Sequence, residues 1–105
     1  ALPIWTLDPV RITNLVRGLS PVPAAYATLR NGDMVQDIKI FRAGAERVPH
    51  REKPGSIVTD GKKMLKVACS NGFVHILELQ TPGKKRLKTP AFLAGFRSSS
   101  NAVFI

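Results

Sequence analysis

The fold of this chain is organised around residues 79–87, Leu-Gln-Thr-Pro-Gly-Lys-Lys-Arg-Leu. The preceding residues 73–79 form the most apolar strand-like run, and a short helix is expected to begin at Thr89-Pro90. Pro82-Gly83 predicts a turn between them, because proline fixes its φ and glycine tolerates positive φ. Four cations follow this turn, Lys84, Lys85, Arg86 and Lys88. Because free N–H groups at a helix start attract anions, we expect these cations and the helix to bind phosphate together.

The sequence before this stretch predicts five short strands. Runs with β character occupy residues 25–30, 34–43, 56–59, 63–69 and 73–79. The dipeptides Asn31-Gly32, Asp60-Gly61 and Asn71-Gly72 separate them and indicate hairpins, since both central residues of a type I′ turn need positive φ. Residues 44–55 are highly charged and contain two prolines, so we expect a long mobile loop there.

A helix is predicted to begin at Asp8-Pro9, because aspartate caps free N–H groups and proline suits the first helical position. Its expected buried stripe has the spacing i, i+3, i+4, i+7 and comprises Ile12, Leu15, Val16 and Leu19. At the other end of the chain, residues 97–101 are polar and are expected to fray. Residues 103–105 are apolar, and the sequence leaves open whether they add an edge strand or are disordered.

These elements predict a mainly β fold, a small OB-like antiparallel β-barrel with an N-terminal helix and a short C-terminal helix. A two-layer sandwich needs about seven strands, more than this pattern supplies. We expect residues 1–24 to be a linker segment with a helix, and residues 25–105 to be the barrel domain.

The composition points to a polyanionic partner. The 105 residues contain 16 Lys and Arg against 7 Asp and Glu, which gives a net charge of +9 and a pI near 10.5. A single cysteine suits a reducing compartment, and no apolar run reaches the roughly 20 residues of a membrane span. We therefore expect a cytoplasmic protein without a membrane partner. The first residue is Ala1 and not Met, so we expect a fragment of a longer protein.

No catalytic or metal-binding set is predicted. Cys69 shares a strand face with Leu65 and Val67, which favours a buried thiol over a nucleophile. The two histidines, His50 and His75, are too few and too scattered for a structural zinc site. We assign no catalytic residue, no metal and no cofactor to this chain.

Binding is better supported, because basic residues recur near turns and at the ends of elements. The predicted nucleic-acid contacts are Arg17, Arg30, Lys62, Lys63, Lys84, Lys85, Arg86 and Lys88. Few aromatic residues are left for stacking on bases, with Trp5, Tyr26 and His50 as candidates. This scarcity favours phosphate and shape contacts to a folded, double-stranded RNA surface.

Two segments resemble methionyl-tRNA formyltransferases. Residues 14–25, Asn-Leu-Val-Arg-Gly-Leu-Ser-Pro-Val-Pro-Ala-Ala, are similar to the segment that leads into the C-terminal domain of that family. Residues 79–87 resemble its Leu-Gln-x-x-Gly-Lys-Lys-Arg motif. Val22, Thr81 and Leu87 depart from the residues common in the family, and each replacement is apolar or compatible with a turn.

The resemblance implies an OB-like C-terminal barrel that holds initiator methionyl-tRNA. A separate N-terminal catalytic domain, absent from this chain, would transfer formyl from 10-formyltetrahydrofolate, so the chain alone is expected to be inactive and monomeric. Two alternatives remain open at this stage. One is a stand-alone OB-like nucleic-acid-binding module, and the other is the second domain of a formyltransferase that acts on a nucleotide sugar.

Overall fold

The computed structural model describes residues 5–19, 25–95 and 102–104. The elements in these ranges are α1 (Pro9–Leu19), β1 (Ala25–Asn31), β2 (Met34–Arg47), β3 (Ile57–Thr59), β4 (Leu65–Cys69), β5 (Gly72–Gln80), β6 (Leu87–Lys88), α2 (Thr89–Gly95) and β7 (Val103–Phe104). Both predicted helices and all five predicted strand regions are confirmed. The short strands β6 and β7 complete the described sheet.

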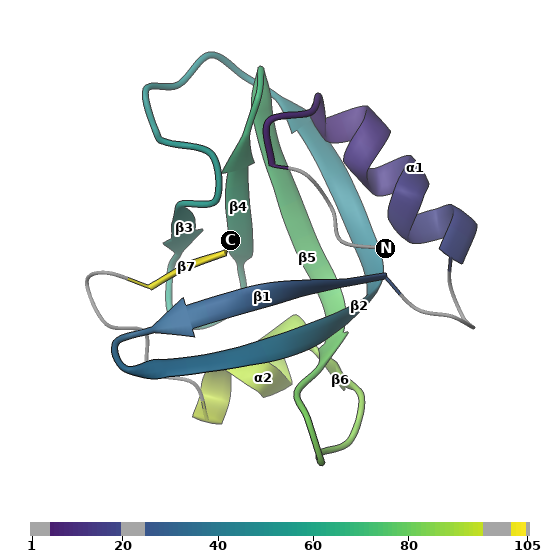
Figure 1. Cartoon of the computed structure of the whole chain (residues 1–105), viewed down its shortest axis with the longest axis vertical. Coiled ribbons are helices and arrows are strands. Elements are labelled where there is room, and N and C mark those ends of the chain that lie inside the picture. Colours follow the sequence, from purple (N-terminus) through teal and green to yellow (C-terminus); the bar gives the residue numbers. More distant parts are fainter. Residues whose placement is uncertain (1–4, 20–24, 96–101, 105) are drawn as a thin grey trace.

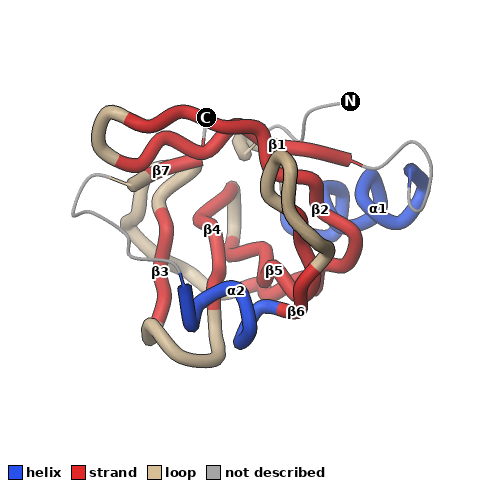
Figure 2. Tube along the Cα trace, turned by 90° about the horizontal axis from the view of Figure 1, so that it is seen from below, coloured by secondary structure: helices blue, strands red, loops and turns tan. Residues whose placement is uncertain are grey.

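The strands form a nearly closed antiparallel barrel (Figure 1). Their order is β3-β4-β5-β2-β1-β7, and β6 pairs separately with β5. A single bridge between Ser56, which precedes β3, and Val103 of β7 links the two ends of this order. Seen from below, α1 lies outside β2 and α2 lies across the open end of the barrel (Figure 2). The predicted fold class is confirmed.

The C-terminal residues Val103 and Phe104 settle one alternative that the sequence left open. They form β7 and pair antiparallel with Arg30 and Leu29 of β1. The apolar end of the chain therefore supplies an edge strand. The predicted frayed segment, residues 97–101, lies outside the described residues.

The expected loop at residues 44–55 is shorter than predicted. β2 continues to Arg47, because β5 pairs with it as far as Gly72 opposite Arg47. This long-range pairing overrides the low β-propensity of the segment. Residues 48–55 remain outside the strands, and His50 ties them to β4 through a hydrogen bond of 2.8 Å between its Nε2 and the Cys69 carbonyl oxygen.

All three predicted hairpins occur, but the type I′ turn expected in them was wrong, because each turn has only one residue with positive φ. Asn31 pairs with Met34, so the turn residues are Gly32 and Asp33, and only Gly32 has positive φ, at 63°. Gly72 pairs with Cys69 and is itself part of β5. A Cβ on Gly72 would lie 1.9 Å from the Glu46 carbonyl oxygen, so the close approach of β2 requires this glycine.

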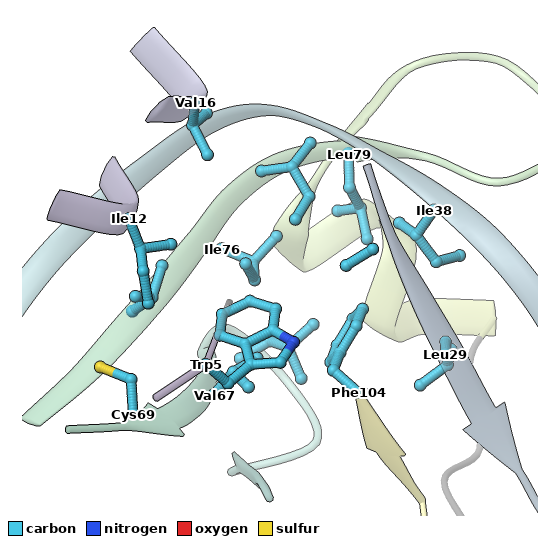
Figure 3. Packing of buried hydrophobic residues seen from close by; sticks show 14 of the residues in the cluster. Trp5, Ile12, Val16, Leu29, Ile38, Val67, Cys69, Ile76, Leu79 and Phe104 are labelled. Carbon is cyan, nitrogen blue, oxygen red and sulfur yellow. The ribbon is translucent and has the colours of Figure 1, made fainter. Parts of the chain in front are cut away.

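Helix α1 contributes to the barrel core with a stripe different from the predicted one. Asp8 caps the helix as expected, accepting the Val10 N–H at 2.9 Å. Ile12 and Val16 are buried in the same cluster as Ile76 and Leu79 (Figure 3). Leu15 is 39% exposed, so its predicted burial was wrong.

The reason is a rotation of the packing face. The buried positions of α1 are Pro9, Ile12, Thr13 and Val16, again with the spacing i, i+3, i+4, i+7. The Thr13 hydroxyl donates to the Val10 carbonyl oxygen at 3.0 Å, which satisfies this polar group inside the interface. Thr13 is therefore buried on the packing face of α1, whereas Leu15, which the sequence pattern placed there, is exposed.

Candidate nucleic-acid interface

Two of the predicted cations, Lys84 and Lys85, stand on a defined hairpin. Gly83 has a φ of 73°, and the Lys84 N–H donates to the Thr81 carbonyl oxygen at 3.2 Å to close the turn. The Gln80 side chain donates to the Lys84 carbonyl oxygen at 2.6 Å. The hairpin projects from the lower end of the barrel (Figure 1), and Lys84 and Lys85 are exposed on it.

Arg86 differs from these lysines because two side chains hold it. Its Nε donates to the Glu78 carboxylate, and its guanidinium carbon lies 4.2 Å from the centroid of the Phe41 ring. The Glu78 side chain is 13% exposed and the Arg86 side chain 45% exposed. Arg86 therefore links the hairpin to Glu78 and Phe41, and part of its charged side chain remains exposed to solvent.

The start of α2 is separated from the lysines by β6. Leu87 and Lys88 pair back onto Leu79 and Glu78 of β5 before the helix begins. Thr89 is buried, and its hydroxyl donates to the Ile76 carbonyl oxygen. The cations Lys84 and Lys85 therefore lie at the β5–β6 turn and not at the start of α2. The first residue of α2, Thr89, instead anchors the helix on β5.

A groove between α1 and β2 brings Arg17 to the same wall as Arg42. Its lining includes Thr13, Arg17, Phe41, Arg42 and Leu77, and both arginines are exposed. The Phe41 ring that lines this groove is the ring on which Arg86 lies. A second groove, between the hairpin and β2, is lined by Lys39 together with residues 80–83.

The structure thus assembles one basic surface from α1, β2 and the β5–β6 hairpin. We define this basic surface as Arg17, Lys39, Arg42, Lys84, Lys85, Arg86 and Lys88. Two carboxylates lie beside these cations. Glu78 is paired with Arg86. Asp37 lines the groove with Lys39 and accepts a hydrogen bond from the Thr28 hydroxyl at 3.0 Å. Cations therefore dominate the surface, as a site for phosphates requires.

Lys62 and Lys63 are exposed on the turn between β3 and β4. Their N–H groups and that of Met64 donate to the Asp60 carboxylate at 2.9, 2.8 and 3.0 Å. The hydrogen bonds from Met64, Lys62 and Lys63 lower the pKa of Asp60 to about 2. The Asp60 carboxylate therefore occupies the turn amides, and only the lysine side chains are available to a ligand.

Like Lys62 and Lys63, Arg30 lies outside the basic surface. It pairs with Val103 of β7 and lines a groove with Lys53 and Trp5, apart from the basic surface.

Sequence reasoning missed Lys39 and Arg42. Lys39 stands between Ile38 and Ile40, both buried, so the alternation of the strand was a sufficient signal for its exposure. Arg42 follows an irregular register between Ile40 and Ala43, where β2 bulges against β5. A bulge re-aims side chains and leaves no periodic signal in the sequence.

Two of the three candidates for stacking on bases, Trp5 and His50, pack against other side chains of the domain. Trp5 is 5% exposed, and its ring centroid lies 5.6 Å from that of Phe104. His50 is half-buried, with its ring centroid 4.5 Å from that of Phe73. The Tyr26 side chain lies outside the described residues. The expectation that Trp5 is a stacking platform was wrong, because the barrel core takes it up.

The groups considered for catalysis are engaged in structure. Burial raises the pKa of the Cys69 thiol to about 11, and the Asp8 charge adds to the effect. His75 Nε2 donates to Glu46 at 2.9 Å and Lys66 donates to it at 3.1 Å, which lowers the pKa of Glu46. Within the described part of the chain, no three His, Cys, Asp or Glu side chains are arranged to hold a metal ion. In the same part, no helix is long and apolar enough to cross a membrane.

Comparison with known proteins places this geometry in a family. Residues 4–97 match the model described as "Formyl transferase, C-terminal domain". A methionyl-tRNA formyltransferase of Bacteroides fragilis is 51% identical over 96 residues, which cover 88% of this chain and 29% of that protein.

Two further methionyl-tRNA formyltransferases are similar. That of Bacteroides thetaiotaomicron is 46% identical over 97 residues, covering 90% of this chain and 30% of that protein. That of Geotalea uraniireducens is 40% identical over 99 residues, covering 94% of this chain and 30% of that protein. The chain spans about three-tenths of the length of these curated relatives. With the matched model covering most of its residues, the chain belongs to the formyl transferase C-terminal domain family.

Proposed function

We propose that this domain binds initiator methionyl-tRNA and positions it for formyl transfer from 10-formyltetrahydrofolate by a separate N-terminal catalytic domain. The observation that carries the proposal is the basic surface, where seven cations from α1, β2 and the β5–β6 hairpin outnumber the neighbouring carboxylates Asp37 and Glu78, and Glu78 is paired with Arg86. The relatives support the substrate, since they are methionyl-tRNA formyltransferases. The proposal places the domain in the cytoplasm.

The shape of the surface favours a folded RNA over a single strand. Its cations stand on a projecting hairpin and along a strand, so they can contact successive phosphates of a folded RNA. Among the described aromatic side chains that line it, the Phe41 ring is covered by Arg86. Sequence-tolerant binding of single strands depends on open aromatic platforms. Phosphate contacts to a double-stranded stem need only the cations.

A binding measurement tests this function. Fluorescently labelled initiator methionyl-tRNA is titrated with the chain at low salt, with unlabelled tRNA and a single-stranded oligoribonucleotide of similar length as competitors. We expect saturable binding of the labelled tRNA. Unlabelled folded tRNA should displace it at a concentration at least about tenfold lower than the single-stranded oligoribonucleotide does. Equal competition by the single strand would favour a general nucleic-acid-binding module. No binding would favour a structural second domain of a formyltransferase with a different substrate.

A further inference from the structure

A third groove lies apart from the basic surface. Its lining residues come from four separate segments and are Trp5, Thr6, Arg30, Lys53, Pro54, Ser56, Val103 and Phe104. The N-terminal segment, β1, the segment before β3 and the C-terminal strand β7 meet here. We call it the Arg30–Lys53 groove.

The backbone fixes three of these side chains in a row. Val103 is paired with Arg30 on one side and with Ser56 on the other, in both cases antiparallel. Residues directly opposite each other in antiparallel pairs project from the same face, with Cβ atoms about 5 Å apart. A guanidinium, an aliphatic side chain and a hydroxyl therefore stand side by side.

Backbone hydrogen bonds hold the segments of the groove together. The Phe104 N–H donates to the Gly55 carbonyl oxygen at 2.8 Å, and the Gly55 N–H donates to the Ala68 carbonyl oxygen at 2.8 Å. The Ser56 N–H donates to the Lys53 carbonyl oxygen at 3.0 Å, which holds Lys53 one turn before Ser56. The groove is thus formed by hydrogen-bonded backbone, with a cation on β1 and another on the neighbouring turn.

The chemistry of the groove suits an anion attached to an apolar body. Two cations and two hydroxyl groups line it, and no carboxylate is among the lining residues. Among the described residues, neither Arg30 nor Lys53 forms an ion pair. Its apolar lining consists of Pro54, Val103 and the side chains of Trp5 and Phe104, whose rings pack against each other. The Trp5 Nε1 group is buried without a hydrogen-bond partner in the described structure.

We propose that the Arg30–Lys53 groove is a second binding site, specific for a nucleoside phosphate. The phosphate lies between Arg30 and Lys53 and accepts a hydrogen bond from Ser56, while the nucleoside rests against Pro54 and Val103. Charge-assisted hydrogen bonds from an arginine are the strongest contacts a protein offers to phosphate. The ligand is either a free nucleotide or a nucleotide within an RNA strand, because both present this chemistry.

The single tryptophan of the chain makes the site directly observable. Trp5 belongs to the groove, so its fluorescence responds to an occupant there. The probes are adenosine monophosphate, inorganic phosphate and a four-residue oligoribonucleotide, each titrated into the chain at low salt. The test variant is Arg30→Ala with Lys53→Ala. The matched control is Arg11→Ala with Arg51→Ala, which removes two other exposed cations.

We expect a saturable change of Trp5 emission with the mononucleotide, with the oligoribonucleotide, or with both. The test variant should weaken it at least about tenfold, which corresponds to one lost charge-assisted hydrogen bond. The control should leave it unchanged, and Arg30→Lys should recover part of the loss. Response to the mononucleotide assigns a free nucleotide, and response to the oligoribonucleotide alone assigns RNA.

Three results would overturn the proposal. These are no saturable change with any probe, an equal loss in the control variant, and inorganic phosphate binding as tightly as the mononucleotide. A parallel titration of the Lys84→Ala, Lys85→Ala variant separates this site from the basic surface. That variant should keep the Trp5 response whether or not the domain binds tRNA through its hairpin.

Discussion

The guanidinium of Arg86 covers the ring of Phe41, with Cζ 4.2 Å from the ring centroid, while its Nε donates to Glu78. This contact connects the β5–β6 hairpin to β2 across the basic surface. It also separates Arg86 from Lys84 and Lys85, which follow the same turn and have exposed side chains. Arg86 therefore stabilises the hairpin, whereas Lys84 and Lys85 present their charges to solvent.

Arg86→Ala should destabilise the domain, whereas Lys85→Ala should not. The arginine change removes a cation–π contact and an ion pair that is open to solvent, and together these contribute about 1 kcal/mol. A surface lysine on a turn usually changes stability by less than about 0.5 kcal/mol. Urea unfolding of both variants measures the difference. Equal stability of the two would mean that the Phe41 contact contributes nothing.

The packing face of α1 gives a second prediction. Ile12→Ala should lower the free energy of unfolding by about 2–5 kcal/mol, because this side chain is 0% exposed in the core. Leu15→Ala should cost less than about 1 kcal/mol, since Leu15 is 39% exposed. Thermal melts of the two variants compare them directly. A larger loss for Leu15→Ala would place the helix in a different rotation.

The difference between Ile12 and Leu15 shows what a hydrophobic pattern can predict. The sequence pattern correctly identified a helix and its capping residue Asp8, because these depend on local chemistry. It could not identify which of two overlapping stripes faces the barrel. That choice depended on Thr13, whose hydroxyl finds a partner within its own helix.

In the candidate site, too, local features were predictable and long-range contacts were not. The cations of the β5–β6 hairpin were predictable from Pro82-Gly83 and the basic run after it. The isolation of Arg30 was not, because it depends on the C-terminal strand pairing with β1. The bracing of Arg86 likewise depends on Phe41, which is 45 positions earlier in the sequence and reaches it through the pairing of β2 with β5. Long-range pairing leaves no mark in local sequence.

A third prediction concerns Gly55, which has a φ of 93°. A Cβ there would lie 2.1 Å from the Phe104 carbonyl oxygen, so Gly55→Ala must displace β7 or unfold it. The matched control is Gly61→Ala, at a φ of 76° with nothing within 4 Å of the added Cβ. The control should cost only the backbone strain of about 1–2 kcal/mol.

Hydrogen exchange provides the measurement for this pair. Gly55→Ala should accelerate exchange of the Phe104 N–H, which donates to Gly55, beyond any change in global stability. Gly61→Ala should not. Identical exchange at Phe104 in both variants would contradict the tight packing of β7 against Gly55.

Asp60 makes stability depend on pH. Its pKa is lowered from 3.8 to about 2 in the folded state, so the stabilisation is present above about pH 4 and is lost as the pH falls towards 2. Asp60→Asn keeps an oxygen acceptor but loses the charge. The variant should therefore be less stable than the unmodified chain at pH 7, and the gap should narrow between pH 4 and 2.

Urea unfolding at several pH values between 7 and 2 measures this gap. Asp33→Asn, in the β1–β2 turn, is the matched control for removing one carboxylate. A gap of constant size across this range would mean that the turn amides of residues 62–64 do not stabilise the charge of Asp60.

The central claim is that the β5–β6 hairpin neutralises tRNA phosphates, and the salt dependence of tRNA binding tests it most directly. The Lys84→Ala, Lys85→Ala variant and the Arg11→Ala, Arg51→Ala control lose the same charge, but only the first loses it from the basic surface. We expect the first variant to flatten the slope of log K against log salt by up to about two units, at about 0.9 per lost phosphate contact, with an unchanged melting temperature. The control should keep nearly the original slope. Equal slopes for the hairpin variant and the unmodified chain would contradict the claim.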